Sequence, residues 1–124
     1  MELIEFYRCP NCDNVVTRLS SACGRMICCG SQMVKLEPKT ADLGQEKHTP
    51  VLTHKDGVLT AACGSVPHPM EPKHYIEWMA LQTEGRLEIV YLKPGEKAEA
   101  SWPDVQHGAV FAYCNLHGLW VTTF

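Results

Sequence analysis

The feature that most constrains the fold of this chain is a set of four cysteines near its N-terminus. Cys9 and Cys12 form a C-x2-C pair, and the adjacent Cys28 and Cys29 follow after fifteen intervening residues. The segment 1–36 that carries them has too few large apolar side chains to build a core, so we expect it to fold around a metal. Four thiolates suit a tetrahedral site for either zinc or iron, and two neighbouring ligands would distort that tetrahedron.

Composition and charge narrow the class of protein. The chain has 124 residues, of which 45% are hydrophobic and 20% charged, as is typical of a globular protein. This length allows a small metal-bound module and one compact domain, but not two full-sized cores. The formal net charge is −3 and there is no run of Lys and Arg, so we expect no nucleic-acid partner and no binding to an anionic membrane.

The N-terminal residues and the cysteine count bear on cellular location. Glu2 and Glu5 stand where a signal peptide needs basic residues, and the apolar stretches are too short for a signal sequence or a bilayer span. We therefore expect a cytoplasmic protein, in which thiols stay reduced. Seven cysteines, an odd number, then favour metal binding over a disulfide framework.

A polar segment divides the chain. Residues 37–44 include Pro38 and Gly44 and show neither helical nor strand periodicity, so they are predicted to form a linker. We place the boundary near Pro38, which gives domains 1–37 and 38–124. The first would be the metal-bound module and the second a compact domain.

After the linker the sequence indicates short strands. The Asp-Gly pair at 56–57 predicts a hairpin turn. Residues 75–82 alternate imperfectly, with Ile76, Trp78 and Ala80 on one face, and their β-branched and aromatic content favours a strand over a short helix. The expected strands are 51–54, 58–62, 75–82, 87–92, 110–113 and 119–124. Short strands at this spacing indicate an all-β fold, an antiparallel β-sandwich.

Four histidines and one cysteine stand in settings that suit metal binding. A single histidine is usually structural, and a C-x2-H pair is common by chance. Together they form a stronger signal, because three of the histidines lie beside or near prolines in non-helical segments and the C-x2-H spacing lets two side chains reach one ion. The candidate ligands are His48, His68, His74, Cys114 and His117. His54 and His107 lack such settings and are predicted to be ordinary surface or strand histidines.

Two parts of the chain resemble known iron proteins. Over residues 1–36 the C-x2-C-x15-C-C pattern resembles desulforedoxin, a small rubredoxin-like protein, which implies iron rather than zinc. From residue 46 to the end, four motifs look like those of the iron domain of desulfoferrodoxin and neelaredoxin, the superoxide reductases. The motifs are E-K-H-x-P at 46–50, G-S-V-P-H-P at 64–69, K-H-Y at 73–75 and C-N-x-H-G at 114–118.

The resemblance implies a fold, two iron centres per chain and an activity. Residues 1–37 would form a desulforedoxin-like Fe(Cys)4 module, and residues 38–124 a neelaredoxin-like domain with an immunoglobulin-like sandwich. The ligands of the first iron would be Cys9, Cys12, Cys28 and Cys29. The ligands of the second, non-haem Fe(His)4(Cys) centre would be His48, His68, His74 and His117 in one plane and Cys114 on the axis. With its sixth position open in the ferrous state, this iron would reduce superoxide to hydrogen peroxide and so detoxify it.

The same resemblance implies partners. Superoxide would be the substrate, and a rubredoxin-type protein would be the electron donor. We also expect a homodimer, because so small an N-terminal module needs to bury its apolar side chains against a partner.

Four further residues carry expectations of their own. Lys47 precedes the first histidine ligand and would place an ammonium near the open position, where it attracts an anion. By resemblance, the Glu46 carboxylate would bind the ferric ion after turnover. Cys23 and Cys63 are not family ligands; we expect Cys23 to be a buried free thiol, and both thiols to be open to oxidation.

Two other functions stay open on the sequence alone. One is an electron-transfer iron protein, in which the cysteine-bound iron passes electrons and the histidines hold a structural metal. The other is a colourless zinc-binding structural module. Visible colour in the oxidised protein would exclude zinc, because thiolate-to-ferric charge transfer absorbs visible light and a d10 ion does not. Reactivity with small anions would count against a pure electron-transfer role.

Overall fold

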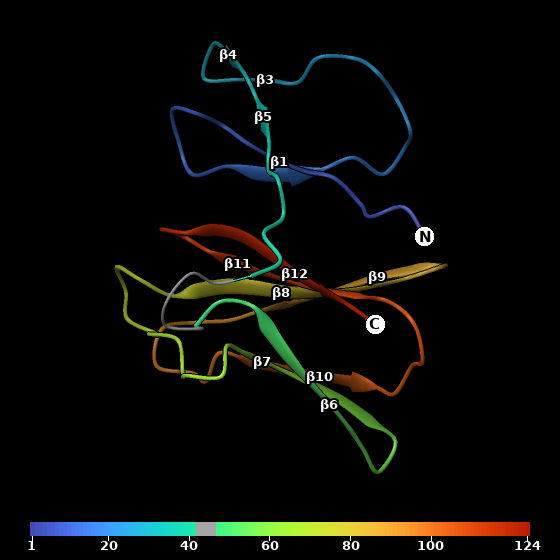
Figure 1. The fold of residues 1–124 in the computed structure, drawn as a ribbon. Helices are drawn as coiled ribbons and strands as arrows, with labels where there is room; N and C mark the ends of the chain where they lie inside the picture. Colours follow the sequence, from blue (N-terminus) through green and yellow to red (C-terminus); the bar gives the residue numbers. More distant parts are fainter. Residues whose placement is uncertain (42–46) are drawn as a thin grey trace. The chain divides into compact units, whose positions relative to one another are not determined.

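The computed structural model describes residues 1–41 and 47–124. Within that part of the chain all regular secondary structure consists of β-strands, so the all-β prediction is confirmed (Figure 1). Contacts between residues separate Glu2–Glu37 from Pro38–Phe124 as two compact units. Residues 42–44 of the expected linker lie outside the described residues.

The N-terminal unit holds two small antiparallel sheets, one with the order β2-β1-β5 and one that pairs β3 with β4. Its strands are β1 (Phe6–Arg8), β2 (Val15–Thr17), β3 (Ile27–Cys28), β4 (Ser31–Gln32) and β5 (Val34–Lys35). Only Phe6, Cys9 and Met33 are buried in this unit. So small a core cannot stabilise a fold by itself, in agreement with the expectation that the unit folds around a metal.

The described residues of the larger unit form a seven-stranded antiparallel β-sandwich. One sheet has the order β10-β7-β6 and the other the order β12-β11-β8-β9. The strands are β6 (Pro50–Lys55), β7 (Val58–Cys63), β8 (Ile76–Thr83), β9 (Arg86–Tyr91), β10 (Glu99–Pro103), β11 (Ala109–Cys114) and β12 (Gly118–Thr123). The core lies between the sheets, where β7 and β10 face β8 and β11. All six residues of β11 are buried, so this strand lies at the centre of its sheet and of the sandwich.

The turn between β6 and β7 has the geometry that its sequence predicts. Asp56 and Gly57 have φ angles of 52° and 76°, and Lys55 pairs with Val58 across the turn. Two left-handed residues make a type I′ turn, whose twist matches that of an antiparallel pair, and glycine adopts it without steric cost. The predicted hairpin is therefore confirmed.

Strand β10 is absent from the strands expected from the sequence. It is five residues long, contains two small residues and ends at Pro103, so its strand signal is weak. Its burial nevertheless alternates strictly, because Ala100 and Trp102 enter the core and their neighbours face solvent. A period of two over so few residues is hard to separate from a loop in sequence alone.

A β-bulge changes which residues of β8 share a face. Tyr113 pairs with Trp78 but Cys114 pairs with Ile76, so Glu77 is an extra residue on β8. Ile76 therefore enters the core cluster, whereas Trp78 stacks on Tyr113 on the opposite face. The prediction that Ile76 and Trp78 share a face is wrong, because it assumed an unbroken alternation. The bulge also sets the position of Cys114 at the end of β11.

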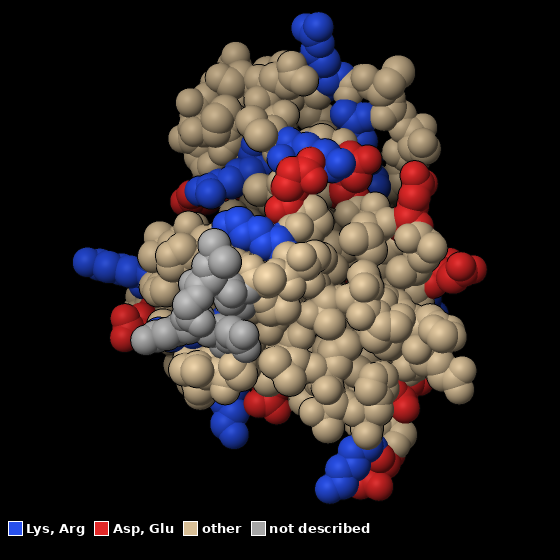
Figure 2. Space-filling model, in the orientation of Figure 1, with Lys and Arg blue, Asp and Glu red and all other residues tan. Residues whose placement is uncertain are grey.

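On the face shown in Figure 2, Lys and Arg side chains are interspersed with Asp and Glu. The described residues form no helix with the length and apolar character needed to cross a membrane.

Candidate metal centres

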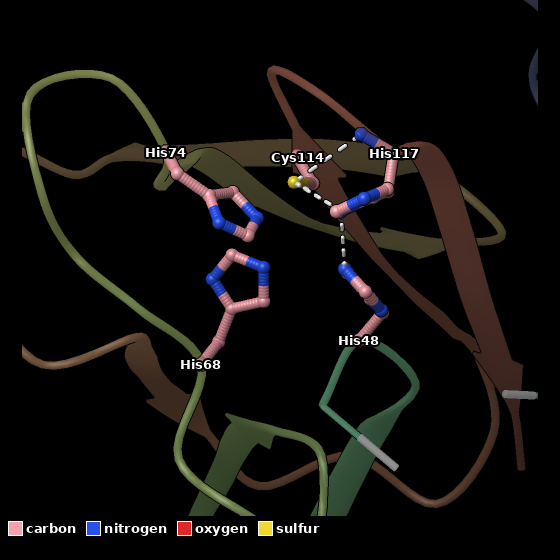
Figure 3. Close-up of side chains that lie close together, drawn as sticks. All are labelled: His48, His68, His74, Cys114 and His117. Atoms are coloured by element: carbon pink, nitrogen blue, oxygen red, sulfur yellow. Dashed lines mark hydrogen bonds between the residues drawn. The ribbon is translucent and has the colours of Figure 1, made fainter. Parts of the chain in front are cut away.

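The five predicted ligands of the second centre converge at one end of the sandwich (Figure 3). His48 precedes β6, His68 and His74 lie between β7 and β8, Cys114 ends β11, and His117 stands in the turn before β12. One ligand atom from each residue lies within 4.8 Å of those of all the others. We call these five residues the histidine–cysteine group. Strand ends meet here because Cys114 pairs with both Ile76 and Gly118.

The four imidazole rings form a closed cycle in the order His48, His68, His74 and His117. Neighbouring ring centroids lie 4.7, 4.7, 5.0 and 4.8 Å apart around the cycle, and the rings meet edge to face at 64° to 80°. Nearly equal spacing around a closed cycle is the arrangement that lets four rings present nitrogens to a single point between them. The group can therefore hold one ion with four nitrogen donors.

Two ring nitrogens of the group have the environment of metal ligands. His68 Nδ1 lies 2.7 Å from the Pro69 carbonyl oxygen, which makes Nδ1 the protonated donor and leaves the Nε2 lone pair free. His68 Nε2 and His74 Nε2 are buried and have no hydrogen-bond partner among the described residues. A buried polar atom without a partner is costly, so a cation fits these two positions.

The electrostatics of the group favour neutral imidazoles. Burial is the main cause that lowers the pKa of His68, to about 4, although the Pro69 carbonyl opposes this shift. Burial, and then the charge of His48, lowers the pKa of both His74 and His117. Because only the neutral ring has a lone pair for a metal, these histidines are ready to bind at neutral pH.

The cysteine of the group is positioned by its own turn. Burial raises the pKa of the Cys114 thiol, and the backbone N–H groups of His117 and Leu116 oppose that rise. The His117 N–H donates to Cys114 Sγ at 3.4 Å. Gly118, with φ of 82°, lets the chain reverse directly after these residues. A bound cation would offset the burial and favour the thiolate.

Two side chains outside the predicted ligand set support the ligands. The Asn115 side chain accepts from the Tyr75 N–H at 3.0 Å and donates to the Lys73 carbonyl at 3.0 Å, which joins the Cys114 turn to the segment that carries His74. The Trp120 ring stacks on His48 at 4.6 Å with an interplanar angle of 11°. Asn115 lies inside the C-N-x-H-G motif at 114–118. Nothing in the sequence marks Trp120, since its partner His48 is 72 residues away.

Of the two residues predicted to assist the second centre, Lys47 and Glu46, the structure describes only Lys47. Lys47 is half-buried, and its charge contributes to the lowered pKa of His74, so the ammonium acts on the histidine–cysteine group. Glu46 lies outside the described residues.

The remaining histidines and cysteines stand outside both metal-binding groups. His54 Nδ1 lies 2.6 Å from the Asp104 carboxylate, and His107 is exposed. Cys63 is buried, with its Sγ 3.9 Å from Met79 Sδ. Cys23 is exposed, so the expectation of a buried thiol is wrong. It lies in an irregular segment with no core to enter.

The four predicted cysteine ligands of the N-terminal unit form the second set, which we call the four-cysteine group. Their sulfur atoms all lie within 4.8 Å of one another. Cys29 has a φ of 52°, and this left-handed backbone lets the adjacent Cys28 and Cys29 turn towards the same point. The Asn11 N–H donates to Cys9 Sγ at 3.4 Å. The Asn14 side-chain amide contacts Cys28 Sγ at 3.7 Å.

Crowding of the sulfurs makes their acidities unequal. Burial raises the pKa of Cys9, but hydrogen bonds from the Asn11 N–H and from the thiols of Cys28 and Cys12 bring it down to about 7. The neighbouring Cys12 and Cys28 side chains raise the pKa of Cys29 to about 12. Four thiolates this close repel one another, and a cation between them relieves the repulsion. The donor set therefore fits a thiophilic ion such as iron.

Known protein families match the two parts of the chain that carry the four-cysteine group and the histidine–cysteine group. A family described as Desulfoferrodoxin matches residues 40–123, and one described as Desulfoferrodoxin, N-terminal domain, matches residues 1–36. The desulfoferrodoxin of Syntrophotalea carbinolica is 42% identical over 120 residues, which cover 96% of this chain and 95% of that protein.

Solved structures give the same result. The superoxide reductase from Treponema pallidum is 25% identical with a TM-score of 0.80, and the match covers 97% of this chain and 98% of that one. The superoxide reductase (1Fe-SOR) from Giardia intestinalis is 28% identical with a TM-score of 0.55, over 64% of this chain and 97% of that one. This chain therefore belongs to the desulfoferrodoxin family.

Proposed function

We propose that this protein is a superoxide reductase, an oxidoreductase that reduces superoxide to hydrogen peroxide by one electron and so detoxifies it. The reaction takes place at the histidine–cysteine group, with a second iron bound by the four-cysteine group. The observation that carries the proposal is the closed cycle of four imidazoles beside the Cys114 thiol. Two solved structures that the chain resembles carry the name superoxide reductase.

The reaction adds one electron and two protons to superoxide and leaves the O–O bond intact. An iron ion held by the five residues of the histidine–cysteine group would supply this electron. The neutral imidazoles leave the centre positively charged, which suits an anionic substrate. The Cys114 thiolate donates electron density to the centre, and the His117 N–H that points at its sulfur moderates this donation.

Two residues that precede the first ligand in the sequence complete the proposed site. The Lys47 ammonium draws the superoxide anion towards the centre and partly offsets the net charge of −3. The Glu46 carboxylate is a hard donor that would suit ferric iron after turnover, and it would help to expel peroxide. These two roles make Lys47 and Glu46 the proposed catalytic residues.

We also propose the partition and the partners of the protein. Residues 1–37 form the Fe(Cys)4 module and residues 38–124 the superoxide-reducing domain. A homodimer is supported by the exposed apolar side chains Leu19, Ile27 and Val34 on a unit with almost no core. A rubredoxin-type protein supplies electrons, and the cytoplasm keeps both sets of thiols reduced.

The experiment that tests the function mixes a superoxide pulse with the prereduced protein under anaerobic conditions. Hydrogen peroxide, dioxygen and the oxidation state of the iron are followed together. One peroxide per superoxide, no dioxygen and oxidised iron are expected. Dioxygen in an amount equal to the peroxide would instead identify a dismutase.

A matched variant and a metal substitution separate the other two functions. Cys114→Ser removes the thiolate and should abolish the reaction while the iron of the four-cysteine group stays in place. The zinc-loaded protein should be colourless and inert. If the iron protein does not react with superoxide but still exchanges electrons with a redox partner, the electron-transfer function replaces the proposed one.

A further inference from the structure

Lys39 is a charged residue next to the histidine–cysteine group. It has no role in the reaction proposed above. Both backbone polar groups of Lys39 are hydrogen-bonded to β12. The Lys39 N–H donates to the Leu119 carbonyl at 2.9 Å, and the Val121 N–H donates to the Lys39 carbonyl at 2.9 Å. Lys39 and Trp120 thus form a parallel β-bridge. Its position beside the metal-binding turn is fixed by the backbone.

The side chain of Lys39 reaches two groups at once. Its ammonium donates to the His117 carbonyl at 2.9 Å and lies 4.9 Å from the centroid of the Trp120 ring. The first contact holds the backbone of a ligand, and the second is a cation–π contact. An exposed lysine whose ammonium has two such contacts is more ordered than a free surface charge.

These contacts connect Lys39 to two of the ligands. Trp120 stacks on His48, and His48 Nε2 lies 3.1 Å from His117 Nδ1. Lys39 therefore reaches His48 through the indole ring and His117 through its carbonyl.

We propose that Lys39 is a positioning residue of the histidine–cysteine group, which orients His48 and His117 and whose positive charge raises the reduction potential of the bound iron. The inference rests on the proposed function, because it needs redox-active iron at this site. Ferric iron carries one more positive charge than ferrous iron, so a nearby cation destabilises the oxidised form more and favours reduction. Because Lys39 is exposed, salt should weaken this effect.

The test compares Lys39→Met with Lys39→Arg. Methionine keeps an unbranched apolar stem without the charge, whereas arginine keeps the charge and a donor. The midpoint potential of the iron at the histidine–cysteine group is measured by redox titration, at low and high salt, of the thiolate-to-ferric absorption band that Cys114→Ser removes. Lys39→Met should shift the potential downwards and reduce its dependence on salt. Lys39→Arg should keep both the potential and its salt dependence close to those of the wild type. Lys55→Met, which removes an exposed lysine at the far end of β6, should leave the potential unchanged.

The outcomes separate the inference from the function on which it rests. A wild-type potential in a folded Lys39→Met protein overturns the inference alone. An equal downward shift in Lys39→Arg overturns the role of the charge. Absence from the wild-type protein of any thiolate-to-ferric band that depends on Cys114 overturns the iron site itself, and with it the proposed function. Thermal unfolding of each variant confirms that it is folded before the potentials are compared.

Discussion

The six histidines differ in what their ring nitrogens contact, and this difference separates ligands from other histidines. His68 Nδ1 is engaged by the Pro69 carbonyl, so the buried Nε2 has a lone pair to offer and no other partner among the described residues. His54 Nδ1 lies 2.6 Å from the Asp104 carboxylate at the surface, so it is already satisfied. The neighbouring prolines marked His68 in the sequence, and burial explains why it suits a metal.

The lowered pKa of His68 predicts the pH dependence of the iron-free sandwich. Its pKa is about 4 in the folded protein and near the ordinary histidine value of 6.5 when unfolded. As pH falls from about 6.5 to about 4, the unfolded chain takes up a proton that the folded chain does not, so the free energy of unfolding should decrease. Denaturant unfolding of the iron-free protein, followed by tryptophan fluorescence at several pH values, measures this.

A pair of variants identifies the residue that causes this pH dependence of the unfolding free energy. His68→Gln should flatten the decrease, whereas the exposed control His107→Gln should keep the wild-type slope. Identical slopes in His68→Gln and wild type would show that another group carries the effect. His74 and His117, whose pKa values are lowered in the same direction, account for what remains.

Lys47 should control the encounter with superoxide. Its charge acts on His74, and steering by one well-placed charge changes an on-rate by roughly 10-fold. We expect Lys47→Ala to slow the second-order reaction by about that factor and to flatten its dependence on ionic strength, in stopped-flow measurements with pulsed superoxide. Lys55→Met serves as a control for loss of a remote charge. A rate that keeps its full salt dependence without Lys47 would remove this role.

At the scale of elements, local signals were predictable and distant pairings were not. The hairpin at 56–57 follows from two adjacent residues, and the four motifs each lie within a few residues. Strand β10 and the bulge at Glu77 depend on partners far along the chain. The stacking of Trp120 on His48 depends on the fold in the same way. The candidate ligands were therefore accessible from sequence, while the residues that hold them in place were not.

Two hairpin glycines provide a matched test of backbone conformation. Gly57 has a φ of 76° and Gly85 has no left-handed φ, and an added methyl group would meet no atom within 4 Å at either position. Gly57→Ala should therefore cost about 1–2 kcal/mol of unfolding free energy through backbone strain alone. Gly85→Ala should change it by less than about 0.5 kcal/mol. Equal effects in denaturant unfolding would contradict the assignment of a type I′ turn.

Asn115 should act as a clamp between two ligand-bearing segments. Its side chain makes two hydrogen bonds to residues 73–75, and its N–H makes a third, to the Tyr75 carbonyl at 3.3 Å. Loss of such support typically lowers metal affinity by about 10- to 100-fold. Asn115→Leu should do so in chelator competition, and Asn115→Asp, which keeps the acceptor oxygen, should lie between it and wild type.

The control for this prediction comes from the other iron site. Asn14→Ala removes a side chain that contacts Cys28 Sγ, so it should affect the four-cysteine group alone. The two irons are distinguished by their absorption bands during the competition. If Asn115→Leu retained iron as tightly as wild type, the clamp would not contribute to binding.

At the scale of the whole molecule, the two units differ in the source of their stability. The sandwich buries side chains from four strands in one core, whereas the N-terminal unit buries only Phe6, Cys9 and Met33. Hydrophobic burial stabilises a fold in proportion to the apolar area removed from water, so the first unit should be stable without metal and the second should not. Binding of iron at the four-cysteine group is then equivalent to folding of that unit.

Loss of the cysteine-bound iron should therefore unfold one unit and spare the other. All three tryptophans lie at 78, 102 and 120, so their fluorescence reports on the sandwich alone. In a Cys9→Ser/Cys12→Ser protein, amide hydrogen exchange should lose its protection throughout residues 2–37, while the unfolding midpoint measured by tryptophan fluorescence keeps its wild-type value. Protection that persists in β1 and β2 would mean that the N-terminal unit folds without metal. A lowered tryptophan midpoint would mean that the stability of the sandwich depends on the N-terminal iron.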